Sequence, residues 1–430
     1  MGPPHGRRDG LLSPGIGCVL PAYGIAESHG SLPRRAVPVR APRAGELSPH
    51  VDRQVPLHTL SDRSLGGGER AGNVRGPLRE TRREMVADAL NALSTEEKQQ
   101  VEERTEALIE ALTTWARRYP FVRIGRILTA SLETAVALPR LPLSDALLAA
   151  QMILWIYGLD DVADERLATV GELRRRGERW CAMAGAGSGI DEEKDGGDEL
   201  TAMLLDMKER LAQSRLFEPL REYWTTCLRL LVEAMARESE YALEYQAHGP
   251  GALPTLEEYL ETGIHSIGMP FWEATVLILL NDDAVLEQFG AVVEVIEHAG
   301  AALRLYNDVR TFDKEMREGG VNAILIVHHE LLAGGMEESK ESALVEAWRR
   351  ILRLADSHAE RCYDLVGRIE TGNGRFEAGV SRLLALYARF YGHSERDRYV
   401  TALDRVGAGG PIRFSTASGL FTTARAESEE

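Results

Sequence analysis

The sequence contains only four cysteines, and their positions form no recognisable pattern. They are Cys18, Cys181, Cys227 and Cys362, with no CxxC pair and no spacing typical of a zinc site. Unpaired thiols persist in a reducing compartment. We therefore expect a cytoplasmic protein without structural disulfides.

Long hydrophobic runs and an excess of basic residues are also missing. No apolar run approaches the ~20 residues that a membrane-spanning helix requires. Proline and glycine interrupt the mildly apolar stretch after Arg7 and Arg8, which argues against an export signal there. The formal net charge is −16, whereas a nucleic-acid partner requires a basic surface. We expect neither a membrane nor a nucleic acid as partner.

The first 80 residues differ in composition from the remainder. They contain 10 of the 18 prolines and show no helical or strand period. Such a segment cannot bury enough apolar surface to offset the entropy of ordering it. The sequence therefore predicts a disordered extension over 1–80, one domain over 81–410 and a flexible tail over 411–430.

Helical patterns dominate from about residue 81. Ser94 with Glu97, and Thr255 with Glu258, form capping boxes that mark two helix starts. Ser144 is a candidate cap for a third helix. No alternating strand pattern of useful length is present. We expect an all-α bundle, with further helices over 269–280, 284–317, 321–333, 341–370 and 375–391.

An acidic motif stands at the end of one apolar helix, at Asp160-Asp161-Val162-Ala163-Asp164. Asp160 and Asp164 are four positions apart and therefore share a helical face. Carboxylates at a helix C-terminus oppose the helix dipole and repel each other. A divalent cation would reverse that cost, although a solvated acidic helix end has the same pattern.

A second motif follows at Asn307-Asp308-Val309-Arg310-Thr311-Phe312-Asp313-Lys314-Glu315. The spacing of Asn307, Thr311 and Glu315 puts three oxygen ligands on one helix face. Such ligands suit magnesium. Lys314 beside them can contact a phosphate as a point charge, and Arg304 lies one turn earlier. A charged, solvated helix face is the alternative.

Together the two motifs make the chain resemble the class I terpene synthases over about residues 85–405. The first matches the DDxxD motif of that family, and the second matches its NDxxSxxxE triad with threonine in place of serine. Arg398-Tyr399 looks like the diphosphate-binding RY pair near the family's C-terminus.

The resemblance implies a magnesium-dependent enzyme that ionises a prenyl diphosphate, with three metal ions. Homodimers are common in the family, but the sequence leaves the oligomeric state open. The implied metal ligands and catalytic residues are Asp160, Asp161, Asp164, Asn307, Thr311 and Glu315, with Asp161 catalytic only. The expected diphosphate contacts are Arg304, Arg310, Lys314, Arg398 and Tyr399. Apolar and aromatic candidates for the cavity wall are Ile153, Ile156, Tyr157, Phe271, Trp272 and Tyr306.

One position departs from the usual bacterial pattern. Gly263 stands where most bacterial members carry a diphosphate-sensing arginine, four residues after Tyr259. Labdane-related diterpene synthases also lack that arginine. The resemblance thus favours a C20 substrate, either geranylgeranyl diphosphate or a bicyclic labdane type such as copalyl diphosphate, and Arg310 or Arg398 becomes a candidate for the missing charge. A protonation-type DxDD motif is absent, which leaves ionisation of the diphosphate as the expected start.

Other functions fit parts of the pattern. A sesquiterpene synthase acting on farnesyl diphosphate would share both motifs. A chain-elongating prenyl transferase should carry a second aspartate-rich motif in place of the Asn307 triad. A carboxylate-bridged metalloprotein needs paired Glu-x-x-His motifs, which we do not find. A non-catalytic helical binding protein fits if the missing arginine means lost activity. His265 is a weak candidate for a terminal base.

Overall fold

The computed structural model describes residues 93–185, 198–334 and 340–388, together with the strand residues 412–414 and 421–423. All of these belong to one unit of the chain. The predicted extension over 1–80 lies outside the described residues. So does most of the predicted tail over 411–430.

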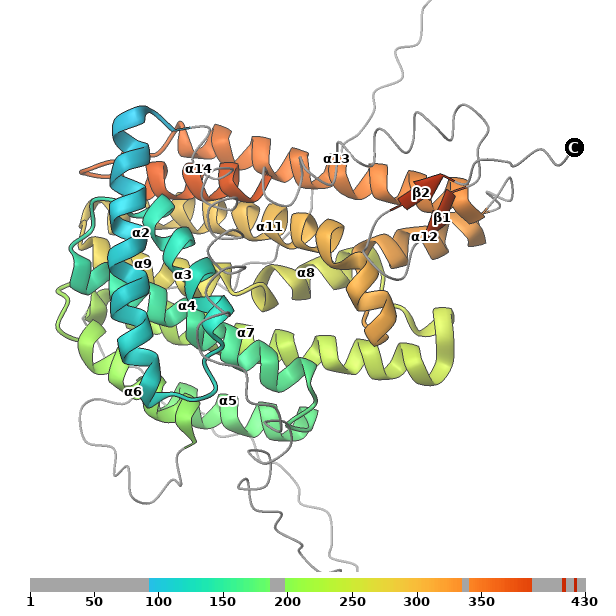
Figure 1. Ribbon diagram of the computed structural model, residues 1–430, viewed down its shortest axis with the longest axis horizontal. Helices are drawn as coiled ribbons and strands as arrows, with labels where there is room; N and C mark the ends of the chain where they lie inside the picture. The colour runs from blue at the N-terminus through green and yellow to red at the C-terminus, as the bar shows by residue number, and fades with distance from the viewer. Residues whose placement is uncertain (1–92, 186–197, 335–339, 389–411, 415–420, 424–430) are drawn as a thin grey trace, which may run out of the picture. The chain divides into compact units, whose positions relative to one another are not determined.

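The described elements are almost entirely helical, which confirms the predicted fold class (Figure 1). The helices and short 3-10 turns are α2 (Thr95–Trp115), η2 (Ala116–Arg118), α3 (Ile124–Ala137), α4 (Leu143–Asp164), α5 (Val170–Gly185), α6 (Glu199–Leu211), α7 (Phe217–His248), η4 (Gly249–Ala252), α8 (Leu256–Ser266), α9 (Met269–Leu280), α10 (Ala284–Glu287), α11 (Phe289–Glu318), α12 (Ala323–Ala333), α13 (Lys340–Val366) and α14 (Arg375–Tyr387). Two three-residue strands, β1 (Ile412–Phe414) and β2 (Phe421–Thr423), pair antiparallel, with Ile412 opposite Thr423. The sequence did not indicate them, because three residues are too few to show an alternating pattern.

Local capping explains where two of the helices begin. Both predicted capping boxes are present: Ser94 and Glu97 start α2, and Thr255 and Glu258 start α8. Ser144, by contrast, is not a cap. Helix α4 begins at Leu143 after Pro142, whose fixed φ suits a helix start and which offers no side-chain hydrogen bond.

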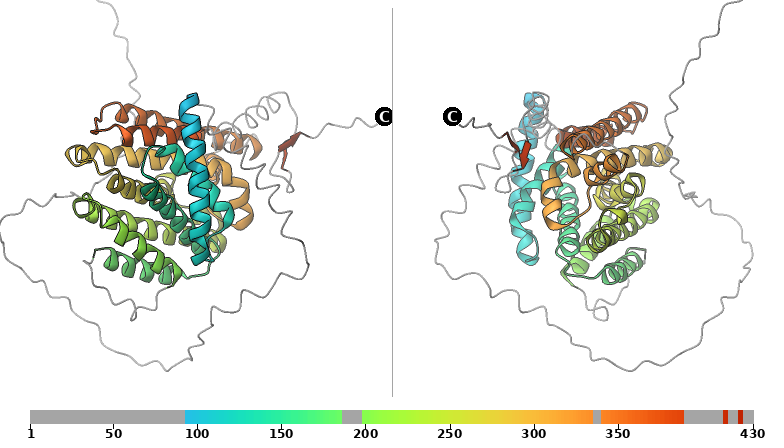
Figure 2. Two further views of the ribbon diagram at one scale, coloured as in Figure 1. Left: turned by 60° about the vertical axis from the view of Figure 1, so that its left-hand side comes forward. Right: turned by 90° about the vertical axis from the view of Figure 1, so that its right-hand side faces the viewer.

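Helix α11 runs through the centre of the arrangement. It packs against α13 on one side and against α8, α9 and α14 on others, while α4 packs against α3, α6 and α9. In Figures 1 and 2, α2 stands upright beside the more level helices α7, α11 and α13. This arrangement brings the ends of α4 and α11, which carry the two predicted motifs, to a common cavity.

Buried tryptophans hold the core behind that cavity. Trp155 lies 5.2 Å from Trp180 and 5.8 Å from Phe271, centroid to centroid. The indole N–H of Trp155 donates to the Leu200 carbonyl, and that of Trp224 donates to the Thr275 hydroxyl. Satisfied indoles pack without loss of hydrogen bonding. They therefore tie α4, α6, α7 and α9 together.

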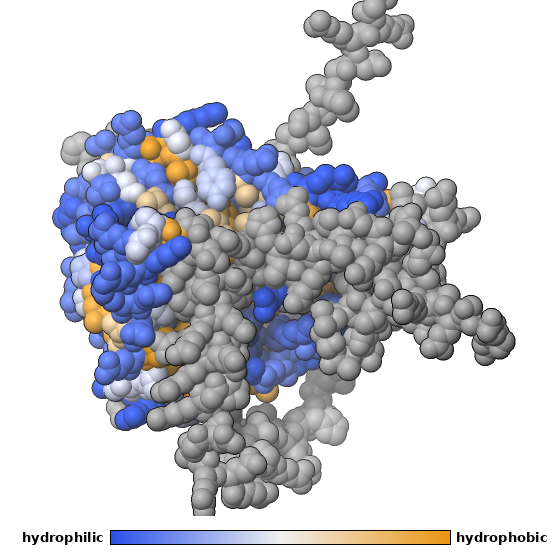
Figure 3. Space-filling view, turned by 45° about the horizontal axis from the view of Figure 1, so that its top comes forward, coloured by the Kyte–Doolittle hydropathy of each residue, from blue (hydrophilic) through white to orange (hydrophobic). Residues whose placement is uncertain are grey.

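Two stretches, Leu143–Asp164 and Leu256–Leu280, are long and apolar enough to cross a membrane by composition alone. In the fold, 72% and 78% of the most apolar 18-residue segments of these two stretches are buried among other helices. The face shown in Figure 3 is mainly hydrophilic, with small hydrophobic patches.

Candidate active site

A cavity of about 830 Å³ opens between α4, α7, α8 and α11, with side chains from α3 and α14 completing its wall. Its size lies in the range of about 300–1,000 Å³ that is usual for small-molecule sites. Both predicted motifs contribute to it. Asp160 and Asp164 come from α4, and Asn307, Thr311 and Glu315 come from α11.

The first motif occupies the last turn of α4. The Asp160 side chain keeps 41% of its surface accessible, yet protein encloses it on several sides. This enclosure, together with the neighbouring Asp164, raises the pKa of Asp160 to about 7. Enclosure also raises the pKa of Asp164, against the effect of Lys314. A bound cation would offset the repulsion between these crowded acids and favour their charged forms.

Asp161 points to a different set of partners. Its carboxylate lies 3.0 Å from Arg123 Nε and 3.3 Å from Arg126 Nη2, both at the start of α3. Asp161 is not among the residues that line the cavity. Arg126 also lies 3.7 Å from Asp160, and Arg123 pairs with Glu165. The two arginines therefore neutralise part of the acidic motif.

The second motif lies along the cavity side of α11, as its spacing predicts. The Thr311 hydroxyl donates to the Asn307 carbonyl at 2.8 Å, so its lone pairs remain available for a ligand. The amide of Asn322 donates to Glu315 Oε2 at 2.8 Å and orients that carboxylate. Burial, followed by the charge of Asp308, raises the pKa of Glu315 to about 7.

Lys314 connects the two walls. Its Nζ lies 3.9 Å from Asp164 on α4 and 3.5 Å from Glu318 on its own helix. The side chain is about half exposed and lines the cavity. An ammonium group in this place can move from carboxylates to the oxygens of an entering phosphate.

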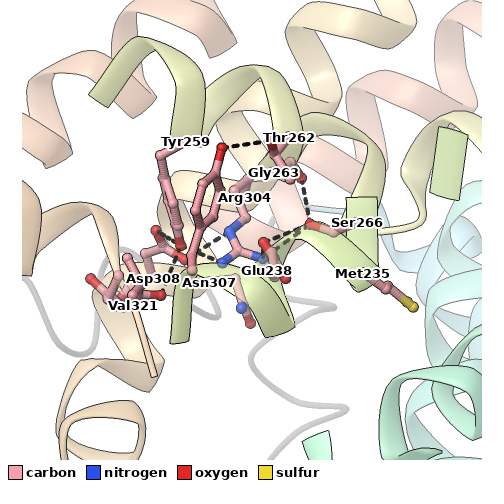
Figure 4. A network of polar contacts seen from close by, with 12 residues as sticks. Met235, Glu238, Tyr259, Thr262, Gly263, Ser266, Arg304, Asn307, Asp308 and Val321 are labelled. Carbon is pink, nitrogen blue, oxygen red and sulfur yellow. Dashed lines mark hydrogen bonds and ion pairs between the residues drawn. The ribbon is translucent and has the colours of Figure 1, made fainter. Parts of the chain in front are cut away.

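Arg304, a predicted diphosphate contact, is held in a buried polar network (Figure 4). Its guanidinium lies 2.8 Å from Glu238 and 3.0 Å from Asp308, and it donates to the Tyr259 hydroxyl and to Ser266. Burial alone would lower its pKa, but Asp308 and Glu238 outweigh burial and raise it. Arg304 is therefore a fixed positive charge at the cavity wall.

Asp308 holds the same network from a buried position on α11 that does not line the cavity. It is fully buried, accepts from the Tyr259 hydroxyl at 2.9 Å and accepts from the Ala323 backbone N–H at 3.0 Å. Burial raises its pKa to about 6 despite the neighbouring Arg304. These bonds fix the cavity-lining face of α11 relative to α8 and to the start of α12.

Gly263, in the last part of α8, and Gly268, between α8 and α9, allow this part of the chain to pack closely against the site. A Cβ on Gly263 would lie 2.8 Å from Arg304 Cγ, and one on Gly268 would lie 2.7 Å from Ile156. Gly268 also has a φ of 80°, which side-chain-bearing residues rarely adopt. The end of α8 thus packs closely against α11, and the link to α9 packs closely against α4.

Only some of the residues predicted for the cavity wall line the cavity. Ile156 and Tyr157 line the cavity. Ile153, Phe271, Trp272 and Tyr306 are not among its lining residues and belong to the core instead. The Trp272 indole donates to the Ala149 carbonyl, and the Tyr306 hydroxyl donates to Asp356. Helical spacing from a motif does not distinguish the cavity face from the neighbouring core face.

Only one of the two arginines considered for the missing charge at Gly263 belongs to the described residues. Arg310 is exposed and is not among the residues that line the cavity. Arg398 and Tyr399 lie outside the described residues. The arginine that does lie against Gly263 is Arg304 of α11. Its side chain packs on that glycine, with Cγ 2.8 Å from where a Cβ would stand.

Several lining residues were not identified from the sequence. Glu238 of α7 faces the cavity and contributes to the raised pKa of Asp160. Arg126 and Tyr387 reach it from α3 and α14. No sequence motif surrounds Glu238. Only its spacing from the neighbouring residues of α7 could have indicated that it lies on a different face of the helix. His265 does not line the cavity.

The oxygen donors of the site suit magnesium. Among the described residues, no three His, Cys, Asp or Glu side chains are close enough to hold an ion by themselves. Magnesium commonly takes one or two carboxylates and completes its shell with waters and substrate phosphates. Carboxylates on both walls, with raised pKa values, provide such a partial shell.

Comparison with known proteins agrees with this geometry. Residues 151–363 match the family model described as terpene synthase family 2, C-terminal metal binding. In sequence the chain is similar to the ent-pimara-8(14),15-diene synthase of Oryza sativa subsp. japonica, with 24% identity over 184 residues. It is also similar to the ent-isokaur-15-ene synthase of Oryza sativa subsp. indica, with 25% identity. Each alignment covers 42% of this chain but only 21% of the rice protein.

Solved structures share the fold. The 2-methylisoborneol synthase of Streptomyces coelicolor A3(2), solved with Mg²⁺ and geranyl-S-thiolodiphosphate, superposes with a TM-score of 0.54 at 17% identity. That match covers 69% of this chain and 93% of the synthase. The linalool/nerolidol synthase of Streptomyces clavuligerus, solved with 2-fluorogeranyl diphosphate, gives a TM-score of 0.52 at 16% identity over 68% and 95% of the two chains.

Proposed function

Because this chain belongs to the class I terpene synthases, carbon–oxygen lyases that act on phosphates, we propose that it ionises a prenyl diphosphate and guides the resulting carbocation to a terpene. The observation that carries this proposal is that both metal-type motifs face one cavity. Lys314 of α11 lies 3.9 Å from Asp164 of α4 within it.

Magnesium would be held by Asp160 and Asp164 on one wall and by Asn307, Thr311 and Glu315 on the other. When bound, it stabilises the negative charge that develops on the departing diphosphate. The relatives solved with Mg²⁺ and diphosphate analogues support this assignment.

The side chains of this protein perform the remaining tasks. Lys314 would move to the phosphate oxygens, and the fixed charge of Arg304 would orient the diphosphate head toward α11. The apolar part of the wall, including Ile156, Met235 and Leu303, excludes water from the cation. The ring of Tyr157 also lines the cavity, and an aromatic face stabilises a cation by roughly 0.5–2 kcal/mol.

We further propose a C20 substrate, either geranylgeranyl diphosphate or a bicyclic diphosphate of the copalyl type. The similarity to two rice diterpene synthases and the glycine at position 263 support it. The structural relatives named for smaller products favour the alternative of a shorter substrate such as farnesyl diphosphate. A cytoplasmic location is proposed from the free thiols of Cys181, Cys227 and Cys362.

The test is a substrate panel. Purified protein with magnesium would be given linear C10, C15 and C20 diphosphates and, separately, a bicyclic labdadienyl diphosphate, with extracts analysed by gas chromatography and mass detection. We expect a diterpene from a C20 substrate. A product from a C10 or C15 substrate alone would reject the chain-length proposal. No product from a folded, magnesium-loaded protein would favour a non-catalytic binding function.

A further inference from the structure

A buried carboxylate lies directly behind two tyrosines of the cavity wall. Glu133 of α3 is only 5% exposed and is not itself a lining residue. The Tyr387 hydroxyl donates to its Oε1 at 2.7 Å. The Tyr157 hydroxyl lies 3.3 Å from Oε1 and 3.5 Å from Oε2. Both tyrosines line the cavity, from α14 and α4 respectively.

The surroundings of Glu133 favour the protonated form of its carboxyl group. Burial raises its pKa to about 7, and the hydrogen bonds from Tyr387 and Tyr157 and the charge of Arg126 partly offset that effect. Arg126 also lies over the Tyr157 ring, 4.4 Å from its centroid. A carboxyl group in this environment can exchange a proton near neutral pH.

We propose that Tyr387, assisted by Tyr157, transfers to Glu133 the proton that the last carbocation loses in this cavity. This inference rests on the proposed function. The C–H bond next to the cationic carbon breaks, and its electron pair forms the double bond of the product. The phenol oxygen gains that proton while its own O–H proton passes to Oε1 of Glu133. The cation is neutralised, and Glu133 ends as the neutral acid.

The arrangement also explains why the carboxylate is hidden. A carboxylate exposed to a carbocation can form an ester with it, which would trap the enzyme. Both tyrosines line the cavity whereas Glu133 does not, so that Glu133 is reached by proton transfer through their hydroxyls rather than by carbon. Tyr387 has the shorter hydrogen bond and is expected to carry most of the transfer.

The inference is tested with Glu133→Gln, Glu133→Asp, Tyr387→Phe, and the double variant of Tyr387→Phe with Tyr157→Phe. The prenyl diphosphate that the wild type accepts would be supplied with magnesium. Two quantities are measured: the rate of diphosphate release and the composition of the terpene products. Tyr363→Phe is the matched control, because Tyr363 is 41% exposed on α13 and its hydroxyl donates to the Ser381 carbonyl, away from the cavity-lining residues.

We expect ionisation to survive and its outcome to change. Diphosphate release should stay within about threefold of wild type in Glu133→Gln. General bases contribute about 10²–10⁴-fold, so the share of the main olefin should fall by at least about tenfold, with other double-bond isomers or alcohols in its place. Glu133→Asp should restore part of that share. The double tyrosine variant should match Glu133→Gln, and Tyr363→Phe should match wild type.

Unchanged product composition in Glu133→Gln and in the double tyrosine variant would overturn the inference while leaving the proposed function standing. If Glu133→Gln released diphosphate more slowly but made the same products in the same proportions, Glu133 would have a structural role. That result would also overturn the inference. If Glu133→Gln does not fold, the tyrosine variants decide, since they remove only hydroxyl groups. Absence of diphosphate release in the wild type with every substrate would overturn the proposed function itself.

Discussion

The side chain of Arg304 fills the space directly over Gly263. A Cβ built on Gly263 would lie 2.8 Å from Arg304 Cγ and 3.2 Å from its Cδ. Tyr259, Asp308 and Glu238 hold the guanidinium, so the arginine cannot easily withdraw. The residue at position 263 therefore controls where a buried positive charge of the site stands.

Replacing Gly263 with alanine is expected to disturb this contact. The added methyl must displace a side chain that is fixed at its far end, and such overpacking costs typically about 1–3 kcal/mol. Denaturant unfolding and diphosphate release would be measured together, and both should decrease. Gly290→Ala on α11 is the control, because no atom of the described residues lies within 4 Å of its added Cβ. A Gly263→Ala protein as stable and as active as wild type would contradict this prediction.

Removal of the Arg304 charge should destabilise the protein strongly. Arg304→Met leaves Asp308 buried without its ion-pair partner, which costs about 3–5 kcal/mol in comparable pairs. Adding Asp308→Asn should recover part of that loss, since the uncompensated charge is then removed. Arg349→Met on α13, about half exposed, should change the free energy of unfolding by no more than about 0.5 kcal/mol. A stability loss in Arg304→Met no larger than in this control would show that the network contributes little.

Glu273 should make stability depend on pH. It is buried in α9, its Oε2 has no hydrogen-bond partner among the residues that the structure describes, and burial raises its pKa from 4.5 to about 8. Between these values the folded protein keeps a proton that the unfolded chain has lost. Its contribution to stability is therefore complete below pH 4.5 and decreases as the pH rises to about 8, by up to roughly 1.4 kcal/mol per pH unit.

Denaturant unfolding at pH 5, 6.5 and 8 tests this dependence. Glu273→Gln cannot ionise, so its stability should fall less with pH than that of wild type, and it should be the more stable protein at pH 8. Glu287→Gln, at an exposed position of α10, should follow the wild-type curve. Parallel curves for wild type and Glu273→Gln would remove Glu273 as a source of pH dependence.

Asp161→Asn should affect turnover less than its place in the acidic motif suggests. The Asp161 carboxylate faces Arg123 and Arg126 and not the cavity. Its loss releases these arginines but removes no cavity-lining oxygen, so we expect a fall in kcat of less than about tenfold. Steady-state kinetics with varied magnesium would check this. A loss as severe as that of Asp160→Asn would mean that Asp161 turns toward the metal during the reaction.

The cavity-lining face of α11 could be predicted from the sequence because Asn307, Thr311 and Glu315 lie on one helix. A spacing of four residues fixes a common face whatever the rest of the fold does. The same reasoning located Asp160 and Asp164, and the capping boxes at Ser94 and Thr255 located two helix starts. These are local features, determined by backbone geometry alone.

Features that depend on several helices could not be predicted in the same way. Arg304 is paired with Glu238 of α7, and no pattern within α11 indicates that partner. Phe271 and Trp272 were expected at the cavity because they are aromatic, yet they complete the tryptophan-rich core. Glu133 gave no signal, because its significance comes from tyrosines on two other helices.

The most direct test of the central claim is magnesium-dependent release of diphosphate from geranylgeranyl diphosphate by the wild type, Asp160→Asn and Asn307→Ala. Each substitution removes one ligand from one wall of the cavity. If both motifs hold the metal that promotes ionisation, release by the wild type requires magnesium, and each variant loses at least about 100-fold in rate while remaining folded. Wild-type rates of release in either folded variant would contradict the claim that the two motifs act together in one active site.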